Sequence, residues 1–241
     1  MSVYALGDLH GRLDILREVQ KIIGEDDKVF FLGDAGDRGP DPWETIKAII
    51  DDERFVYLMG NHEDMLIDAY ISQKKKGEPE IWFDQATQHL QKNDGLDTLQ
   101  QALDDPKGGA YINILRNLPY WDMYQNECGI VCLLSHAGWT MSNYSSPSEF
   151  DLIWDRSHFW DPWDENNYPH VVSIHGHTPI PHMWVQFATP QGEQETGAFW
   201  YCDNHKICID SGAYATDIAI LLNLDTFDEI IVEVPSDKEY N

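Results

Sequence analysis

Short apolar runs alternate with helical patterns along the first quarter of the chain. Three of these runs are largely apolar and are each followed by a glycine: Val3 to Leu6, Lys28 to Leu32 and Phe55 to Met59. This pattern is typical of buried strands. Between the strands, apolar residues recur at helical spacing from Leu13 to Ile23, and prolines start a second helix near Trp43. This order predicts a βαβαβ unit and a largely parallel sheet, and so an α/β fold.

The pattern changes from Glu63 to about Leu118. This stretch is rich in Gln, Asp and Lys and shows a weaker helical periodicity. We expect residues 63–118 to be a helical insertion that covers one side of a site, within a single domain spanning residues 1–241. The run Lys74 to Lys76 is predicted to be a solvated face, with contact to substrate as the alternative.

The second half of the chain is predicted to be rich in strands. Polar clusters follow two apolar runs, and the last two strands are expected to be antiparallel. The expected strands are Ile130 to Leu134, Val171 to Ile174, Trp200 to Ile209, Ala215 to Leu224 and Glu229 to Val234. Between the first two of these, Ser145 to Pro169 is expected to be mostly loop.

Composition narrows the classes of function. The chain has 241 residues and is 42% hydrophobic, which suits a globular domain with a full core. Its formal net charge of −26 disfavours binding to the phosphate backbone of nucleic acids or to an anionic membrane surface. Bound cations would offset this charge locally, so an anionic substrate remains compatible with the sequence.

Cysteine usage and the start of the chain bear on location. The spacings of Cys128, Cys132, Cys202 and Cys208 fit no usual zinc site, and their apolar surroundings predict reduced, buried thiols. The chain begins in a strand pattern without a secretory signal, and no apolar run is long enough to span a bilayer. We therefore expect a cytoplasmic protein. The oligomeric state is not predicted.

Five glycine-flanked clusters of polar residues follow the predicted strands. They are GDLHGR at 7–12, GDAGDRG at 33–39, GNHE at 60–63, SHAG at 135–138 and HGHT at 175–178. Carboxyl ends of strands in open α/β sheets are where ligands bind, so we expect the clusters to form one site.

The residue types in these clusters suit two divalent cations. Carboxylate, amide and imidazole groups are ligands for hard or borderline metals, and one carboxylate can bridge two ions. We expect Asp8, His10 and Asp34 on the first metal, and Asp34, Asn61, His136 and His177 on the second. A hydroxide held between the metals would then attack a phosphate ester without a serine or cysteine nucleophile.

Other residues in or near the clusters are predicted to bind phosphate and move a proton. Arg38 and Arg156 can each clamp phosphate oxygens, with Asn61 as a further phosphate contact, although a surface arginine is the alternative for both. His62 can protonate the leaving group while Asp37 holds its other ring nitrogen. The alternative for His62 is a histidine that only supports its loop.

The HGHT segment leaves one choice open. His177 is favoured as the metal ligand because it follows Gly176 in the expected turn. Ligation by His175, which would share a strand face with His177, is the alternative.

These motifs closely resemble those of calcineurin-like metallophosphoesterases. The DRG and GNHE forms are similar to the phosphoprotein phosphatase branch. GNHEDML and the later IDSGAY resemble bacterial and phage-type serine/threonine phosphatases and the related symmetrical diadenosine tetraphosphate hydrolases. The resemblance runs from Val3 to about Leu224, apart from the insertion.

The resemblance implies a central mixed β-sandwich flanked by helices and a centre of two metals, manganese most of all, or iron with zinc. It implies the same metal ligands, Asp37 with His62 as the acid, and Arg38 and Arg156 on phosphate. One departure concerns Pro179, which stands where many relatives outside this branch have a further histidine. The resemblance therefore implies fewer protein ligands, and an added water, on the first metal.

Three functions follow from this reading. The first is hydrolysis of phosphomonoesters, especially phosphoserine or phosphothreonine in proteins, and small phosphorylated molecules are also candidate substrates. The second is cleavage of a dinucleoside polyphosphate such as diadenosine tetraphosphate, which is disfavoured by the scarcity of basic residues. The third is a non-catalytic scaffold, which the complete set of expected ligands argues against.

Overall fold

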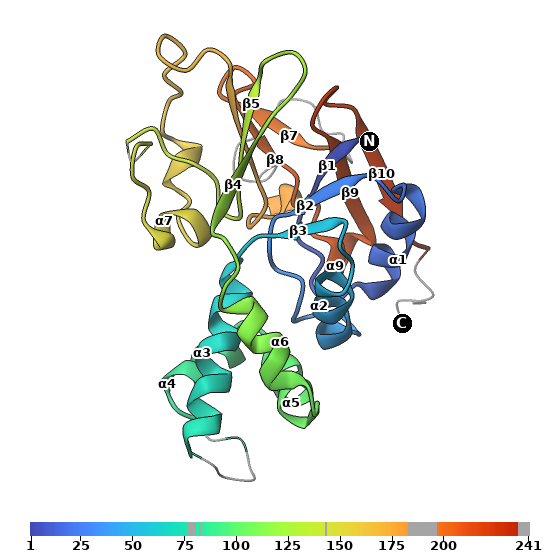
Figure 1. Cartoon of the computed structure of the whole chain (residues 1–241). Helices are drawn as coiled ribbons and strands as arrows, with labels where there is room; N and C mark the ends of the chain where they lie inside the picture. The colour runs from blue at the N-terminus through green and yellow to red at the C-terminus, as the bar shows by residue number, and fades with distance from the viewer. Residues whose placement is uncertain (77–80, 82, 143, 183–196, 236–241) are drawn as a thin grey trace.

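The computed structural model describes residues 1–76, 81, 83–142, 144–182 and 197–235. These residues form two five-stranded sheets (Figure 1). The first has the strand order β10-β9-β1-β2-β3. Its strands are β1 (Val3–Leu6), β2 (Lys28–Phe31), β3 (Phe55–Tyr57), β9 (Ile218–Asn223) and β10 (Glu229–Glu233). The β1, β2 and β3 strands are parallel, whereas β9 and β10 are antiparallel, both as predicted.

The second sheet has the order β4-β5-β6-β8-β7. Its strands are β4 (Trp121–Gln125), β5 (Val131–Ser135), β6 (Val171–His175), β7 (Phe199–Tyr201) and β8 (Lys206–Cys208). The β5, β6 and β8 strands are parallel, so their carboxyl ends meet at one edge. Both sheets are mixed, in agreement with the expected fold class.

The alternation of side chains along β1 shows how the layers are held together. Val3 and Ala5 are buried in a core with Leu134 and Ile174 of the second sheet. Tyr4 and Leu6 point to the opposite face and join a core that includes buried residues of α1 (Leu13–Ile22) and α2 (Pro42–Ile50). Two sheets therefore pack face to face, with helices on the outer face of the first.

Four helices extend from the sheets as an arm (Figure 1). They are α3 (Asn61–Lys76), α4 (Gln85–Gln91), α5 (Leu96–Asp104) and α6 (Gly108–Leu115). The sequence predicted helices here, and α3 begins two residues earlier than the expected boundary. Lys74 to Lys76 are exposed, and Lys74 lies over the ring of Tyr70.

The prediction of one strand from Trp200 to Ile209 was wrong. The segment is a hairpin of β7 and β8, because Cys202, Asp203 and Asn204 adopt positive φ angles of 50°, 53° and 69° and reverse the chain. No glycine or proline marked this turn. The edge strand β4 was not predicted, since its side chains are largely exposed.

Three short helices lie in segments that were predicted as loop or strand. They are α7 (Glu149–Ile153), the 3-10 helix η1 (Ser157–Phe159) and α9 (Ala213–Thr216). As a result the strand predicted to begin at Ala215 begins at Ile218.

The four cysteines are free thiols. Cys132 and Cys208 are buried as predicted, but Cys128 is exposed because it lies in the turn between β4 and β5. Among the described residues, we find no helix with the length and apolar character needed to cross a membrane.

Candidate metal centre

The carboxyl ends of strands from both sheets meet at one buried cluster. Asp8 and His10 follow β1, Asp34 follows β2, and Asn61 and His62 begin α3 just after β3. The second sheet contributes His136 after β5 and His177 after β6. All seven side chains are buried. The five sequence motifs therefore converge on one place, as expected from the positions of the strands.

Asp34 lies at the centre of this cluster. Its Oδ2 atom is 3.6 Å from His10 Nε2, 3.8 Å from His62 Nε2 and 3.4 Å from His136 Nε2. Burial alone would raise the pKa of Asp34, but the charges of His136 and His62 hold it well below its ordinary value. An ionised carboxylate between three imidazoles can serve as a ligand in both candidate metal groups.

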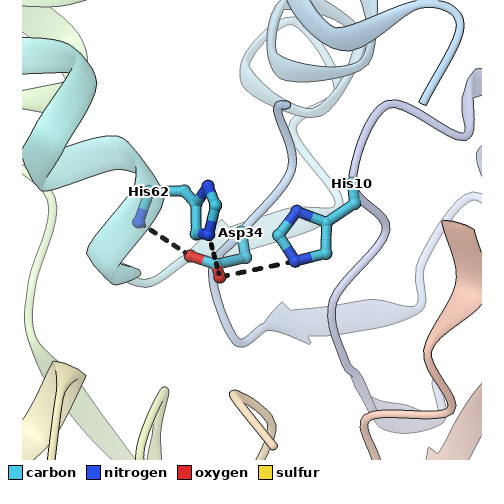
Figure 2. A group of neighbouring side chains, drawn as sticks. All are labelled: His10, Asp34 and His62. Carbon is cyan, nitrogen blue, oxygen red and sulfur yellow. Dashed lines mark hydrogen bonds and ion pairs between the residues drawn. The ribbon is translucent and has the colours of Figure 1, made fainter. Parts of the chain in front are cut away.

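One candidate ligand group joins His10, Asp34 and His62. Their ligand atoms lie within 4.8 Å of one another, and Figure 2 shows both rings turned towards the Asp34 carboxylate. His10 Nδ1 donates to the carbonyl of Gly36 at 2.9 Å, so its Nε2 atom is left with a lone pair facing the cluster. Asp8 Oδ2 is 3.9 Å from the same Nε2 atom. Asp8, His10 and Asp34 are thus grouped as the sequence predicted, and His62 lies beside them.

The second candidate group joins Asp34, His136 and His177. Asn61 Oδ1 lies 2.9 Å from both His136 Nε2 and His177 Nδ1, and these nitrogens are 3.1 Å apart. His136 Nδ1 donates to the carbonyl of Leu32 at 2.8 Å. With that hydrogen placed on Nδ1, neutral His136 directs its Nε2 lone pair at the amide oxygen, and either a second ring proton or a bound cation would relieve this contact between two acceptors.

The charge around His136 favours a cation. Burial would lower the pKa of His136, but the carboxylates of Asp34 and Asp8 raise it to about 10. In the absence of metal, a proton on His136 partly neutralises the negative charge of these carboxylates. A divalent cation among the same atoms would neutralise more of this charge. The donor set of carboxylate, amide oxygen and imidazole suits such an ion.

The structure adds a further carboxylate that the sequence analysis did not assign to the site. Asp210 follows β8, is buried, and accepts a hydrogen bond from the backbone of Gly212 at 2.9 Å. Burial raises its pKa to about 6. Burial also raises the pKa of Asp8 well above its ordinary value, and the charge of Asp210 adds to this. The position of Asp210 after a strand, in IDSGAY, was the available signal.

Asp37 and Arg38 contact His62 from one side of the cluster. His62 Nδ1 lies 2.6 Å from Asp37 Oδ2, and the other Asp37 oxygen accepts a hydrogen bond from Thr98 of the arm. Arg38 places Nη2 3.2 Å from His62 Nε2 and Nη1 2.7 Å from His10 Nε2. The expected pairing of Asp37 with His62 is thus present, and the exposed Arg38 reaches into the cluster.

Arg156 contacts the segment that carries His177. Its Nε atom donates to Thr178 Oγ1 at 3.1 Å, and Nη2 donates to the carbonyl of His177 at 3.4 Å. This guanidinium is therefore tied to the loop that carries His177. His175, the alternative ligand, has both ring nitrogens engaged elsewhere, by the Gly176 carbonyl at 3.0 Å and the Tyr201 hydroxyl at 2.8 Å.

Glu63 holds the backbone next to the cluster, and the sequence did not identify it. Its carboxylate accepts from the backbone N–H groups of Asp34, Ala35 and Gly60 and from the Tyr57 hydroxyl, at 2.7 to 3.1 Å. Burial raises the pKa of Glu63, yet all four partners are donors, so they favour the charged acceptor. Glu63 thereby fixes the turn that presents Asp34.

The backbone at the cluster adopts unusual conformations. His10, Asp34, Asp37, Arg38 and His177 all have positive φ angles, between 43° and 68°. Non-glycine residues rarely adopt this region, and such conformations gather at functional sites. Gly176 is needed for space, because a Cβ atom there would lie 2.1 Å from Asp8 Oδ1.

A cavity of about 780 Å³ opens beside Arg38. Tyr214 forms part of its wall, with the Arg38 guanidinium carbon 4.9 Å from the centre of the ring. The facing wall comes from the arm and includes Gln91, Asp94 and Asp97. The cavity therefore joins the cluster to the helical arm.

A family model and several curated proteins match this chain. The model of the family described as calcineurin-like phosphoesterase matches residues 1–209. Among curated proteins, the chain is 26% identical to a symmetrical bis(5'-nucleosyl)-tetraphosphatase from Thioalkalivibrio sulfidiphilus, over 65% of this chain and 50% of that protein. The chain spans about half the length of the curated relatives it matches.

Solved structures share the fold. A protein serine/threonine phosphatase from Saccharomyces cerevisiae superposes with a TM-score of 0.61 at 13% identity, covering 99% of this chain and 82% of that one. A metallophosphoesterase from Sphaerobacter thermophilus gives 0.57 at 15% identity, covering 98% and 89%. These likenesses support the α/β architecture of two mixed sheets flanked by helices.

Proposed function

Because this chain belongs to the calcineurin-like phosphoesterase family, and is therefore an enzyme, we propose that it hydrolyses phosphomonoesters at a centre of two divalent metal ions. The preferred substrates are phosphoserine and phosphothreonine in proteins. The observation that carries this proposal is the Asp34 carboxylate, which lies within 3.8 Å of Nε2 atoms from three histidines.

The ligand roles follow from the two groups around Asp34. One cation is assigned to Asp8, His10 and Asp34, and the other to Asp34, Asn61, His136 and His177. When bound, the two cations supply Lewis acidity to the phosphoryl oxygens and lower the pKa of water at the site. Manganese is the proposed metal in both positions.

The remaining residues bind the ester and move one proton. Arg38 contacts His10 of the first ligand group and Arg156 contacts the backbone of His177 in the second, so their guanidinium groups suit the oxygens of a phosphate bound at the cluster. Asn61 is proposed to contact phosphate as well as metal. His62 donates its Nε2 proton to the leaving oxygen while Asp37 stabilises the imidazolium through Nδ1.

The cavity beside Arg38 is proposed to hold the leaving group. Its volume of about 780 Å³ is larger than a small alcohol needs, and its wall on the arm includes Asp94 and Asp97. Two carboxylates disfavour the extra phosphates of a polyphosphate chain. They tolerate a peptide, which supports the phosphomonoester as substrate. The arm is thus proposed to border the site.

A dinucleoside tetraphosphate is the second candidate substrate. The observation in its favour is the name of the curated relatives, which are symmetrical bis(5'-nucleosyl)-tetraphosphatases of 26% to 31% identity. Cleavage of a phosphoanhydride would use the same metals and the same arginines. It would place a nucleotide, instead of a peptide, in the cavity beside Tyr214.

A substrate panel tests the proposal. The purified protein with Mn²⁺ is given p-nitrophenyl phosphate, phosphoserine and phosphothreonine peptides, and diadenosine tetraphosphate. We expect kcat/KM for a phosphopeptide to exceed that for diadenosine tetraphosphate. Rapid cleavage of diadenosine tetraphosphate with negligible turnover of the peptides would favour the second candidate. No turnover of any ester would contradict the proposed chemistry itself.

A further inference from the structure

A chain of hydrogen bonds links two buried histidines to the loop that carries His177. His158 Nδ1 lies 2.7 Å from the Tyr201 hydroxyl, which lies 2.8 Å from His175 Nε2. His175 Nδ1 lies 3.0 Å from the Gly176 carbonyl, immediately before His177. His158 is 1% exposed and His175 is not exposed. The chain therefore connects the segment just after Arg156 to the loop that carries a proposed metal ligand.

Only one arrangement of hydrogens satisfies this chain. The Gly176 carbonyl is an acceptor, so His175 Nδ1 donates to it and neutral His175 accepts at Nε2. The Tyr201 hydroxyl must then donate to His175, and it accepts from His158 Nδ1. Each hydrogen has one place, so the chain sets the orientation of both imidazole rings.

A buried lysine holds the same segment from another direction. Lys206 is not exposed, and its ammonium donates to the carbonyls of His158 at 2.5 Å and Asp161 at 2.7 Å. These carbonyls lie in and just beyond η1, the 3-10 helix that Arg156 precedes. A buried ammonium is costly unless it is hydrogen-bonded, so these two contacts define where η1 can lie.

The ring of His158 also contacts the loop of the other histidine ligand. A Cβ atom at Gly138 would lie 3.1 Å from three atoms of this ring. Gly138 is two residues after His136 and has a φ of 99°. The absence of a side chain at Gly138 thus allows His158 to lie directly against the loop that carries His136.

These contacts place His158 between the loops that carry His136 and His177 and the segment that carries Arg156. We propose that His158, Tyr201 and Lys206 are positioning residues that hold Arg156 at a set distance from His136 and His177. The inference rests on the proposed role of Arg156 in binding phosphate. It assigns a function to a polar network that touches neither metal nor substrate.

A double-mutant cycle between Tyr201 and Arg156 tests this inference. Tyr201→Phe removes one oxygen, and Arg156→Ala removes the guanidinium. The inhibition constant of inorganic phosphate and the KM for p-nitrophenyl phosphate are measured in the Mn²⁺-loaded enzyme. Tyr124→Phe is the matched control. Tyr124 lies on β4, at the opposite edge of the sheet from Tyr201 on β7, and its hydroxyl also donates one hydrogen bond, to Asp225 at 2.6 Å.

We expect Tyr201→Phe to raise the phosphate inhibition constant by about 3- to 10-fold, since small displacements of a binding group cost affinity. The metal content of Tyr201→Phe should equal that of the wild type, and Tyr124→Phe should leave the inhibition constant unchanged. In the Arg156→Ala background, Tyr201→Phe should not raise the inhibition constant any further. Multiplicative effects in the double variant, or loss of metal from Tyr201→Phe, would overturn the inference.

Two further results separate this inference from the proposed function. If Arg156→Ala leaves the inhibition constant unchanged, the phosphate role of Arg156 fails and the inference falls with it. His158→Asn keeps an N–H donor near the place of Nδ1 and should retain the wild-type constant, whereas His158→Leu should raise it. Equal constants for these two variants would also overturn the inference.

Discussion

His62 Nδ1 lies 2.6 Å from Asp37 Oδ2, and both side chains are buried. Burial alone would lower the pKa of His62, but the charge of Asp34 and the hydrogen bond that His62 donates to Asp37 raise it above its ordinary value. Asp34 and Asp37 therefore favour the imidazolium, with a proton on Nε2, and they outweigh the opposing charge of Arg38, whose Nη2 lies 3.2 Å from Nε2. This is the protonation state that a general acid needs near neutral pH.

His62→Asn should lower kcat by about 10²- to 10⁴-fold on an alkyl phosphate such as a phosphoserine peptide. The loss on p-nitrophenyl phosphate should be much smaller, because that leaving group needs little protonation. Steady-state rates on both substrates provide the test. Equal losses on the two would count against the acid role.

Metal content provides the control for that experiment, because His62 also lies close to His10 and Asp34. We expect elemental analysis of His62→Asn to give the wild-type metal content. Loss of one ion from this variant would instead assign His62 as a ligand.

The sequence predicted that the residues of the five clusters would meet, because each follows a strand or begins a helix just after one. Asp8, Asp34 and His136 could be placed in this way, since the carboxyl ends of parallel strands meet. The supporting residues could not be found by the same route. Glu63 and His158 act through contacts between segments that are distant in the chain, and neither spacing nor residue type signals these contacts.

Glu63→Gln should lower the free energy of unfolding by about 3 kcal/mol in the presence of EDTA. The amide keeps the size of the side chain but turns one acceptor into a donor facing N–H groups of the Asp34 turn. Urea unfolding measures the change. Glu44→Gln, an exposed residue on α2, is the control and should change it by no more than about 0.5 kcal/mol. Similar values for both variants would contradict the role given to Glu63.

Acid should destabilise the metal-free protein through His175. Burial lowers its pKa to about 3, far below its ordinary value near 6.5. The folded state therefore disfavours the proton that the unfolded state accepts, so stability falls as the pH drops below about 6.5. Between pH 7 and pH 5 this one group should cost about 2 kcal/mol.

The comparison that isolates this effect is His175→Asn. Urea unfolding of the wild type and the variant in EDTA is measured at pH 7 and pH 5. The variant should lose about 2 kcal/mol less than the wild type over this interval. An identical loss in both proteins would show that His175 is protonated in the folded state.

The fold was predictable where hydrophobic pattern and burial agree. The β1 and β2 strands are short apolar runs that are largely buried, and β3 is a short apolar run beside them, so pattern alone identified all three. The β4 strand exposes Trp121 and Met123 at an edge, and its pattern carried little signal. The turn between β7 and β8 uses Asp203 and Asn204 in left-handed conformations, which the sequence shares with many other polar pairs.

The residues around Asp34 are proposed to hold two divalent cations, which would supply the Lewis acidity for hydrolysis of a phosphate ester. The direct measurement is a titration of EDTA-treated protein with Mn²⁺, following p-nitrophenyl phosphate turnover and metal content together. Turnover should rise to a plateau near two ions per chain. Asp8→Asn should bind less metal, and Asp34→Asn should lose most metal and turnover. Undiminished turnover without metal, or an Asp34→Asn variant that binds two ions and turns over at the wild-type rate, would contradict the claim.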